Sequence, residues 1–171
     1  MRGTLYISIL RLIGLLLFQV MLLNQIKLHG FVNPYIYPLG ILLFPFETAR
    51  WLLMVIAFFS GLFIDMFTDT PGLHASALVL MAFVREYIIN INRPVGDYEP
   101  AHQPTISSLG SQWFFGYAGT LVLIHHTVFF FAEAYTFSMF LSTLAKIGIS
   151  AIVSLMLMFL FQYLFYTKQT A

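Results

Sequence analysis

Two strongly apolar segments, 51–59 and 77–84, meet at one polar break in the middle of the chain. The break contains two carboxylates, Asp65 and Asp69, and the turn sequence Thr70-Pro71-Gly72. Carboxylates beside lipid-facing sequence are costly, so they are rarely without a role. The pattern predicts that one hydrophobic helix ends here and that the next helix begins directly afterwards.

Gly61, Asp65 and Asp69 follow one another at intervals of four residues. This spacing places the three on one face of a helix. A glycine on that face predicts close packing against a neighbouring segment, with a polar contact at the helix end. A simpler interpretation also fits: the two acids mark a helix end in the headgroup layer, and Pro71 and Gly72 belong to an ordinary turn. The spacing alone leaves both open.

Charged residues are scarce along the whole chain. Only 9% of the 171 residues are charged and 60% are hydrophobic, whereas a soluble domain carries roughly a quarter charged residues. The composition therefore predicts an integral membrane protein. A net charge of +1 supplies no basic surface for nucleic acid. The absence of cysteine excludes disulfides, thiolate catalysis and cysteine-ligated metals.

The apolar segments predict a single all-α transmembrane domain over residues 1–171 with six transmembrane helices. Arg11 interrupts the first apolar run and no small-residue cleavage site follows it, so we expect a retained first span instead of a signal peptide. The expected spans lie at about 5–28, 35–46, 51–67, 73–89, 113–131 and 137–165, and a proline-rich loop lies at about 90–112.

The second of these segments is short and broken. Pro34 and Pro38 both block regular helix hydrogen bonding, so the segment is either a broken crossing or a re-entrant loop. Such backbone is tolerated at membrane depth only where protein covers it. Tyr35 and Tyr37, next to the prolines, suggest an anchor at the membrane interface.

The distribution of basic residues predicts the orientation. With six crossings, Arg2, Arg50, Arg93 and Lys168 all lie at cytoplasmic ends. Five crossings would place Arg50 and Arg93 outside. We therefore expect six crossings, with both termini in the cytoplasm.

Isolated charges inside the spans are candidates for contacts within the membrane. Lys146 lies two to three turns into the last span, and we hypothesise that it pairs with Asp65. Arg85 and Glu86 are neighbours and point about 100° apart on a helix. Either both reach the interface, or one of them faces the bundle interior.

Signatures of catalysis are missing from the sequence. It contains neither Gly-x-Ser-x-Gly nor His-Glu-x-x-His. His125 and His126 are adjacent, so their side chains diverge around a helix and make a poor metal pair. We predict no catalytic residue, no cofactor and no metal site. Small residues in the last span instead suit helix packing: Ser142, Gly148, Ser150, Ala151 and Ser154.

Three stretches resemble MreD, the rod shape-determining membrane protein family of bacteria. They are residues 33–51 (NPYIYPLGILLFPFETARW), residues 61–65 continuing to 71–75 (GLFID and PGLHA), and the closing residues 162–165 (QYLF). The chain length and the six-span pattern agree with the family, and the resemblance covers nearly the whole chain.

The resemblance implies a non-enzymatic component of the cell-wall elongation machinery in the bacterial cytoplasmic membrane. Such a protein supports cell shape and peptidoglycan synthesis. It binds the transmembrane helix of MreC and is connected indirectly to MreB and to the RodA/PBP2 synthase pair. The family fold is similar to the S component of energy-coupling-factor transporters, which suggests a groove that takes a partner helix in place of a vitamin.

An S-component-like subunit that binds a small molecule such as a vitamin is the alternative. The shortage of polar side chains in mid-membrane favours the scaffold. No catalytic residue is implied by the family. The residues expected to serve structure or partner contact are Gly61, Asp65, Asp69, Pro71, Gly72, Lys146 and Arg85.

Overall fold

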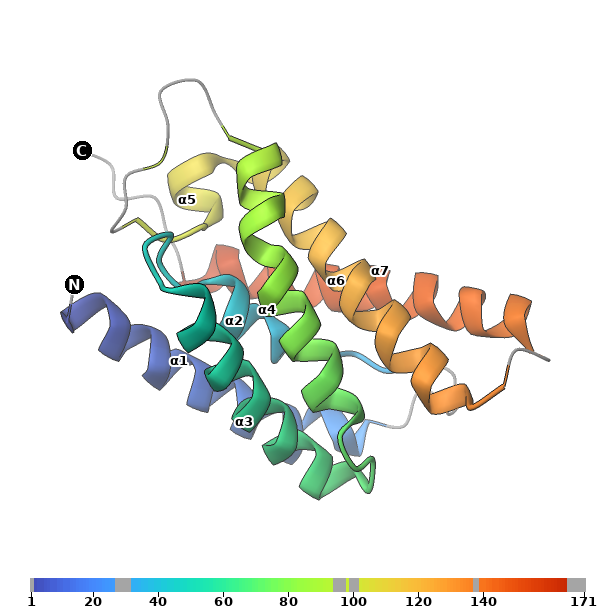
Figure 1. Cartoon of the computed structure of the whole chain (residues 1–171). Helices are drawn as coiled ribbons and strands as arrows, with labels where there is room; N and C mark the ends of the chain where they lie inside the picture. The colour runs from blue at the N-terminus through green and yellow to red at the C-terminus, as the bar shows by residue number, and fades with distance from the viewer. Residues whose placement is uncertain (1, 27–31, 94–97, 99–101, 137–138, 166–171) are drawn as a thin grey trace.

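The computed structural model describes residues 2–26, 32–93, 98, 102–136 and 139–165, and its regular elements are all helices. Figure 1 shows their arrangement. They are α1 (Arg2–Met21), η1 (Leu23–Gln25), α2 (Pro38–Leu42), α3 (Arg50–Thr68), α4 (Leu73–Ile91), α5 (Ile106–Leu109), α6 (Ser111–Ala134) and α7 (Phe140–Phe165).

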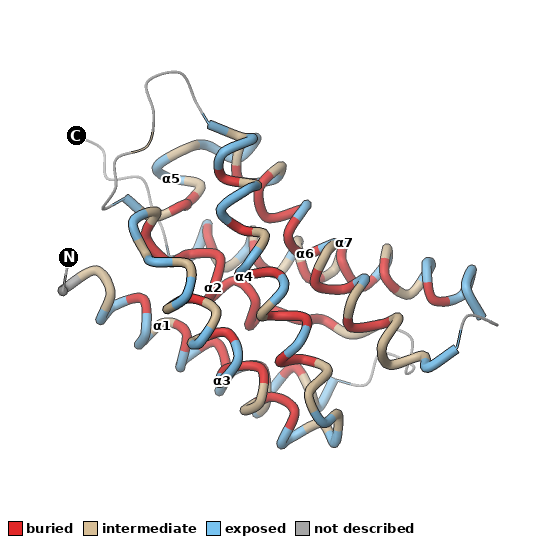
Figure 2. The backbone as a smooth tube through the Cα atoms, viewed as in Figure 1, coloured by how far each residue is buried: buried red, intermediate tan, exposed pale blue. Residues whose placement is uncertain are grey.

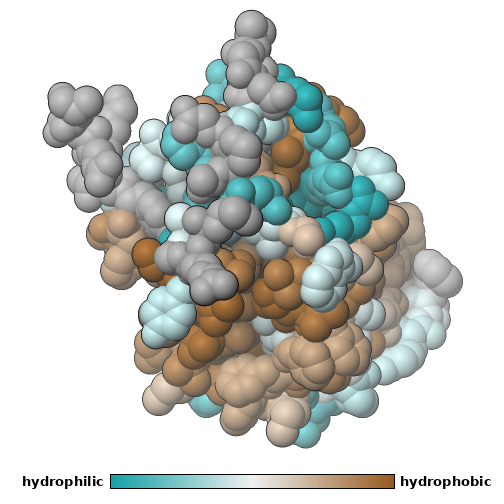
Figure 3. All heavy atoms as spheres, turned by 60° about the vertical axis from the view of Figure 1, so that its left-hand side comes forward, coloured by the Kyte–Doolittle hydropathy of each residue, from teal (hydrophilic) through white to brown (hydrophobic). Residues whose placement is uncertain are grey.

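Five helices in the described part of the chain are long and apolar enough to cross a membrane. They are α1 with its continuation to Gln25, α3, α4, α6 and α7. Large apolar side chains cover their outer faces, and in Figure 3 the apolar surface forms a broad region below a hydrophilic end. Soluble proteins rarely expose apolar patches of this extent. The helices fit a multi-pass membrane protein.

The long helices run between two ends of the bundle, α1 and α3 in the same direction and α4 in the opposite one. At one end the start of α3 contacts the end of α4, where Arg50 Nε donates to Glu86 Oε2 at 2.6 Å. At the other end Asp65, near the end of α3, accepts from the backbone N–H of His74 at the start of α4. The first half of α1 lies toward the first end, because Arg11 and Ser8 contact Gln103, and the carbonyl of the adjacent His102 accepts from Phe46 N just before α3.

The segment between α1 and α3 passes through the centre of the bundle. It begins beside the last turns of α1, where Gln19 donates to Pro34 O at 3.1 Å and accepts from Ile36 N at 2.9 Å. Every residue of α2 is buried, as Figure 2 shows by its red trace. The prediction that protein covers this broken segment is confirmed.

The prediction that Tyr35 and Tyr37 anchor the segment at the interface is wrong. Their exposed fractions are 7% and 0%. The prolines leave the extended backbone without helical partners, so side chains must supply hydrogen bonds inside the bundle. Ser154 Oγ of α7 accepts from Tyr35 N at 2.9 Å, and Ser150 Oγ accepts from Asn33 N at 3.2 Å.

Some of the small residues of α7 thus pack inside the bundle, whereas others lie on its surface. Three small residues of the helix are buried against the broken segment and its neighbours: Ser150, Ala151 and Ser154. Ser142 is exposed, and a Cβ at Gly148 would meet no atom within 4 Å.

The predicted loop at 90–112 also holds a short helix, α5, which begins with a capping box at Thr105. Residues 94–97 and 99–101 of this loop lie outside the described residues.

Candidate functional site

The turn between α3 and α4 is built around the Asp65 carboxylate. Oδ1 accepts from His74 N at 3.0 Å and from Thr70 Oγ1 at 2.9 Å, and Oδ2 accepts from Ala75 N at 3.1 Å. The first N–H groups of a helix have no partner within it and carry the positive end of its dipole. Asp65 therefore caps α4 from the preceding helix and fixes the angle between the two.

The residues around Asp65 form a tight connection. Asp69 ends α3 in the left-handed region at φ 54°, and Gly72 precedes α4 at φ 82°. Asp69 and Pro71 are exposed. A Cβ on Gly61 would lie 2.2 Å from Ala75 Cα, so only glycine fits there. The close packing predicted at Gly61 is confirmed.

The hypothesis that Lys146 pairs with Asp65 is wrong. Lys146 Nζ lies 2.7 Å from Glu133 Oε2 and 4.7 Å from the centre of the Phe130 ring. Glu133 belongs to the last turn of α6, which is adjacent to α7, whereas both oxygens of Asp65 already accept from the start of α4. The pair therefore joins α6 to α7.

Arg85 faces the bundle interior and is 3% exposed, whereas its neighbour Glu86 is on the surface. Nε of Arg85 donates to Tyr117 Oη at 2.8 Å, and Nη2 donates to the carbonyl oxygens of Leu42 and Phe44. The sequence left open whether both side chains reach the interface or one faces the bundle interior, and the structure shows the latter. Arg85 attaches the end of α2 to α4 and α6.

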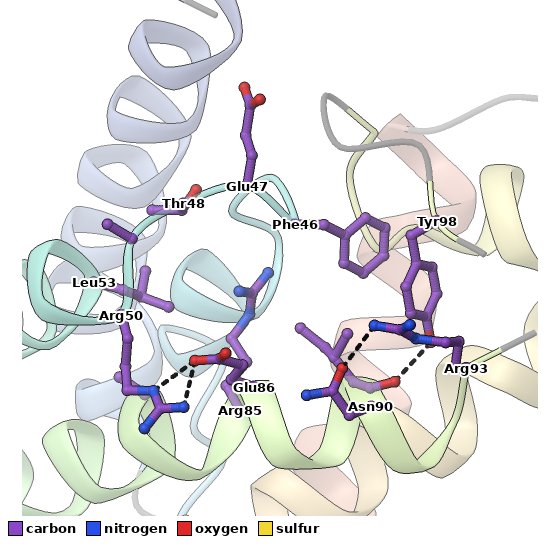
Figure 4. Close-up of a pocket in the computed structure, with 13 residues that line it drawn as sticks. Phe46, Glu47, Thr48, Arg50, Leu53, Arg85, Glu86, Asn90, Arg93 and Tyr98 are labelled. Carbon is purple, nitrogen blue, oxygen red and sulfur yellow. Dashed lines mark hydrogen bonds and ion pairs between the residues drawn. The ribbon is translucent and has the colours of Figure 1, made fainter.

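A cavity of about 470 Å³ lies beside Arg85, at the end of the bundle where α3 begins (Figure 4). The turn at 46–49, the first turn of α3, the last turns of α4 and Tyr98 line it. Its charged residues are Arg50, Arg85, Arg93, Glu47 and Glu86. Sequence reasoning missed this cavity, because its residues come from three separate stretches of the chain.

A cluster of histidines and tyrosines fills the centre of the bundle, and sequence reasoning also missed it. Tyr37 Oη lies 2.6 Å from His74 Nδ1 and 2.8 Å from His125 Nε2. His126 Nδ1 lies 2.9 Å from Val122 O. All three histidines are buried. Within the described residues no group of three or more possible ligands has the geometry to hold a metal ion.

The contacts of the cluster determine where its protons lie. His126 Nδ1 must donate to the Val122 carbonyl, which only accepts. His125 Nδ1 lies 3.5 Å from this donor, so an unprotonated nitrogen fits there best. His125 Nε2 then donates to Tyr37, and Tyr37 donates to His74 Nδ1.

This chain of hydrogen bonds leaves one N–H without a partner. It is the Nε2–H of His74, which is buried and makes no hydrogen bond in the described structure. His74 stacks on Phe129, with ring centres 4.2 Å apart. Both residues line a second cavity of about 480 Å³ at the end of the bundle opposite Arg85.

Comparison with protein-family models, with curated proteins and with solved structures found no match for the chain.

Proposed function

We propose that the chain is a non-enzymatic membrane scaffold of the MreD type, which holds the transmembrane helix of MreC in the cell-wall elongation machinery. The resemblance in residues 33–51 and 61–75 supports this assignment. These stretches form the buried broken segment and the tight α3–α4 turn, which are the internal supports of the bundle. Asp65 and Lys146 both have partners within the chain, as expected for residues that support the bundle.

An open groove between α6 and α7 is the observation that carries the proposal. Its volume is about 390 Å³, and four small residues are among those that line it: Gly116, Gly119, Gly148 and Ala151. A Cβ on Gly148 would meet no atom within 4 Å. Lipid supplies no hydrophobic drive between helices, so close backbone approach over small residues is a main source of helix association in membranes. The groove suits a partner helix of this kind.

Co-purification with MreC tests the proposal. A Cβ at position 148 meets no atom within 4 Å, so a leucine there projects into the groove, and Gly148→Leu should abolish recovery of MreC and leave the fold intact. Gly14→Leu is a matched control, because a Cβ on Gly14 of α1 also meets no atom within 4 Å. Recovery of MreC with Gly148→Leu at the wild-type level contradicts this placement, and no recovery with the wild-type chain contradicts the function.

For the topology we propose six crossings of the bacterial cytoplasmic membrane, with both termini in the cytoplasm. Residues 32–49 carry the chain from the end of α1 to the start of α3, which lie at opposite ends of the bundle. The broken segment then acts as the second crossing between five long helices. With the N-terminus in the cytoplasm, Arg50 and Arg93 then lie on the cytoplasmic side, which the distribution of basic residues favours.

A small-molecule-binding subunit similar to an S component remains the second candidate. The cavity beside His74 favours it, because His74, whose buried Nε2 has no hydrogen-bond partner, lines it together with Phe129. Mass spectrometry of small molecules released from the purified, denatured chain separates the two candidates. A stoichiometric organic ligand without MreC supports the second candidate, and MreC without such a ligand supports the scaffold.

A further inference from the structure

We propose that the cavity beside Arg85 binds a phosphate group. The first argument is the charge of Arg85, which is 3% exposed. Its hydrogen-bond partners are the Tyr117 hydroxyl and two backbone carbonyl oxygens, and no carboxylate among the described residues contacts it. A buried cation without an opposite charge is unfavourable. An anion in the adjacent cavity removes this cost.

The second argument is the direction of the unused donors. Nε and Nη2 of Arg85 make the hydrogen bonds to protein, whereas Nη1 makes none to a described residue. Figure 4 shows the side chain extending from α4 toward the turn that precedes α3. The cavity lies between these two elements, and Arg85 lines it. The two N–H groups of Nη1 are therefore available at the cavity wall, and a guanidinium is a donor group well suited to phosphate.

The third argument is the start of α3, which lines the same cavity through Thr48, Ala49 and Arg50. Ala49 occupies the N-cap position and supplies no side-chain cap. The first N–H groups of this 19-residue helix therefore lack the usual acceptor. Such a helix end favours an anion, and it adds to the guanidinium from an independent element.

The charges and surroundings of the cavity favour a phosphodiester. Three arginines against two glutamates leave one positive charge in excess among the lining residues. Glu86 is already paired with Arg50 at 2.6 Å. Trp51 and Tyr87 are exposed at the same end of α3 and α4, as expected for aromatic side chains at headgroup level. Basic cavities between membrane helices take anionic lipid headgroups, although free phosphate offers the same chemistry.

Thermal unfolding of the full chain in micelles of an uncharged maltoside detergent, which contains no phosphate, tests the proposal. Phosphatidylglycerol or inorganic phosphate is added in separate titrations, and a ligand of the folded state raises the midpoint. A rise with phosphatidylglycerol alone identifies a lipid headgroup as the ligand, and a rise with both shows that the cavity also takes free phosphate. No rise with either overturns the proposal.

Three variants connect the effect to the cavity. Arg85→Met should weaken phosphatidylglycerol binding roughly tenfold or more, because it removes charge-assisted hydrogen bonds. Arg11→Gln removes the same charge from α1, at the same end of the bundle but outside the cavity, and should leave the affinity within about twofold. An equal loss in both variants overturns the proposal.

Glu47→Gln keeps the proposal testable if Arg85→Met fails to fold. Glu47 is exposed at the rim of the cavity, so its replacement does not disturb the core. Removal of this negative charge should strengthen phosphatidylglycerol binding by about twofold or more. An unchanged affinity contradicts an anion in this cavity.

Discussion

The contact between Gly61 and Ala75 sets how closely α3 and α4 pack. A Cβ at position 61 would lie 2.2 Å from Ala75 Cα and 2.5 Å from Ala75 N. These are backbone atoms, so they cannot give way as a flexible side chain does. Gly61→Ala should therefore lower the free energy of unfolding by about 2–4 kcal/mol. Thermal unfolding in detergent measures the change.

Gly14→Ala is the control for this substitution. It lies in a helix and has no atom within 4 Å of its ideal Cβ. Alanine is favoured over glycine in a helix by up to about 1 kcal/mol, so Gly14→Ala should be neutral or slightly stabilising. Equal unfolding temperatures for the two variants show that the helices do not pack at Gly61 as the structure describes.

Asp65 and Asp69 are close in sequence but differ in their contacts. Asp65 accepts three hydrogen bonds at the start of α4, whereas Asp69 is exposed and adopts a left-handed conformation. Asp65→Asn replaces one acceptor with a donor and removes the charge, so it should cost about 1–3 kcal/mol of unfolding free energy. Asp69→Asn should change it by less than about 0.5 kcal/mol, because asparagine tolerates this conformation. A similar loss in both variants, measured by thermal unfolding, contradicts the capping role.

At the scale of elements, the pair of Lys146 and Glu133 joins α6 to α7. Lys146 Nζ lies 2.7 Å from Glu133 Oε2, and the exposed fractions of the Lys146 and Glu133 side chains are 21% and 35%. Lys146→Glu or Glu133→Lys alone places like charges together and should lower stability by about 1 kcal/mol or more. The double variant restores an opposite pair and should recover most of the loss. A double variant no more stable than the worse single one, in thermal unfolding, excludes the contact.

The long helices were largely predictable from the sequence, because their signals are local. The predicted span 51–67 corresponds to α3 (Arg50–Thr68), and 73–89 corresponds to α4 (Leu73–Ile91). Apolar length identifies the helices, and the Thr-Pro-Gly turn separates them. The fate of the short second segment was not predictable, because the prolines exclude a regular helix without indicating which side chains replace its hydrogen bonds.

In the candidate sites too, contacts between residues close in sequence were easier to predict than contacts between distant ones. The Gly61 and Asp65 contacts form within 14 residues of sequence, so the spacing offered close packing and a polar contact there as one of two interpretations. The cluster of Tyr37, His74 and His125 joins positions up to 88 residues apart. Its members give no pattern in sequence, since their neighbourhood depends on how the helices pack. Arg85 is similar, because carbonyl oxygens of a distant segment bind it.

At the scale of the whole molecule, the path of the broken segment decides the topology. This segment lies between α1 and α3, and α1 and α3 both begin at the end of the bundle that holds the Arg85 cavity. In the six-crossing topology proposed above, residues at the two ends face opposite sides of the membrane. Glu47 and Ser107 are exposed at the first end, and Asp69 and Tyr135 are exposed at the other.

Single cysteines at these four positions test the topology without background, because the wild-type chain contains no cysteine. We expect a membrane-impermeant maleimide, added to intact cells, to label Asp69→Cys and Tyr135→Cys. Glu47→Cys and Ser107→Cys should react only after the membrane is opened, because basic residues gather at their end. The opposite pattern shows an inverted bundle, in which the Arg85 cavity faces outward. Labelling of Glu47→Cys and Ser107→Cys from different sides contradicts the passage of residues 32–49 through the membrane.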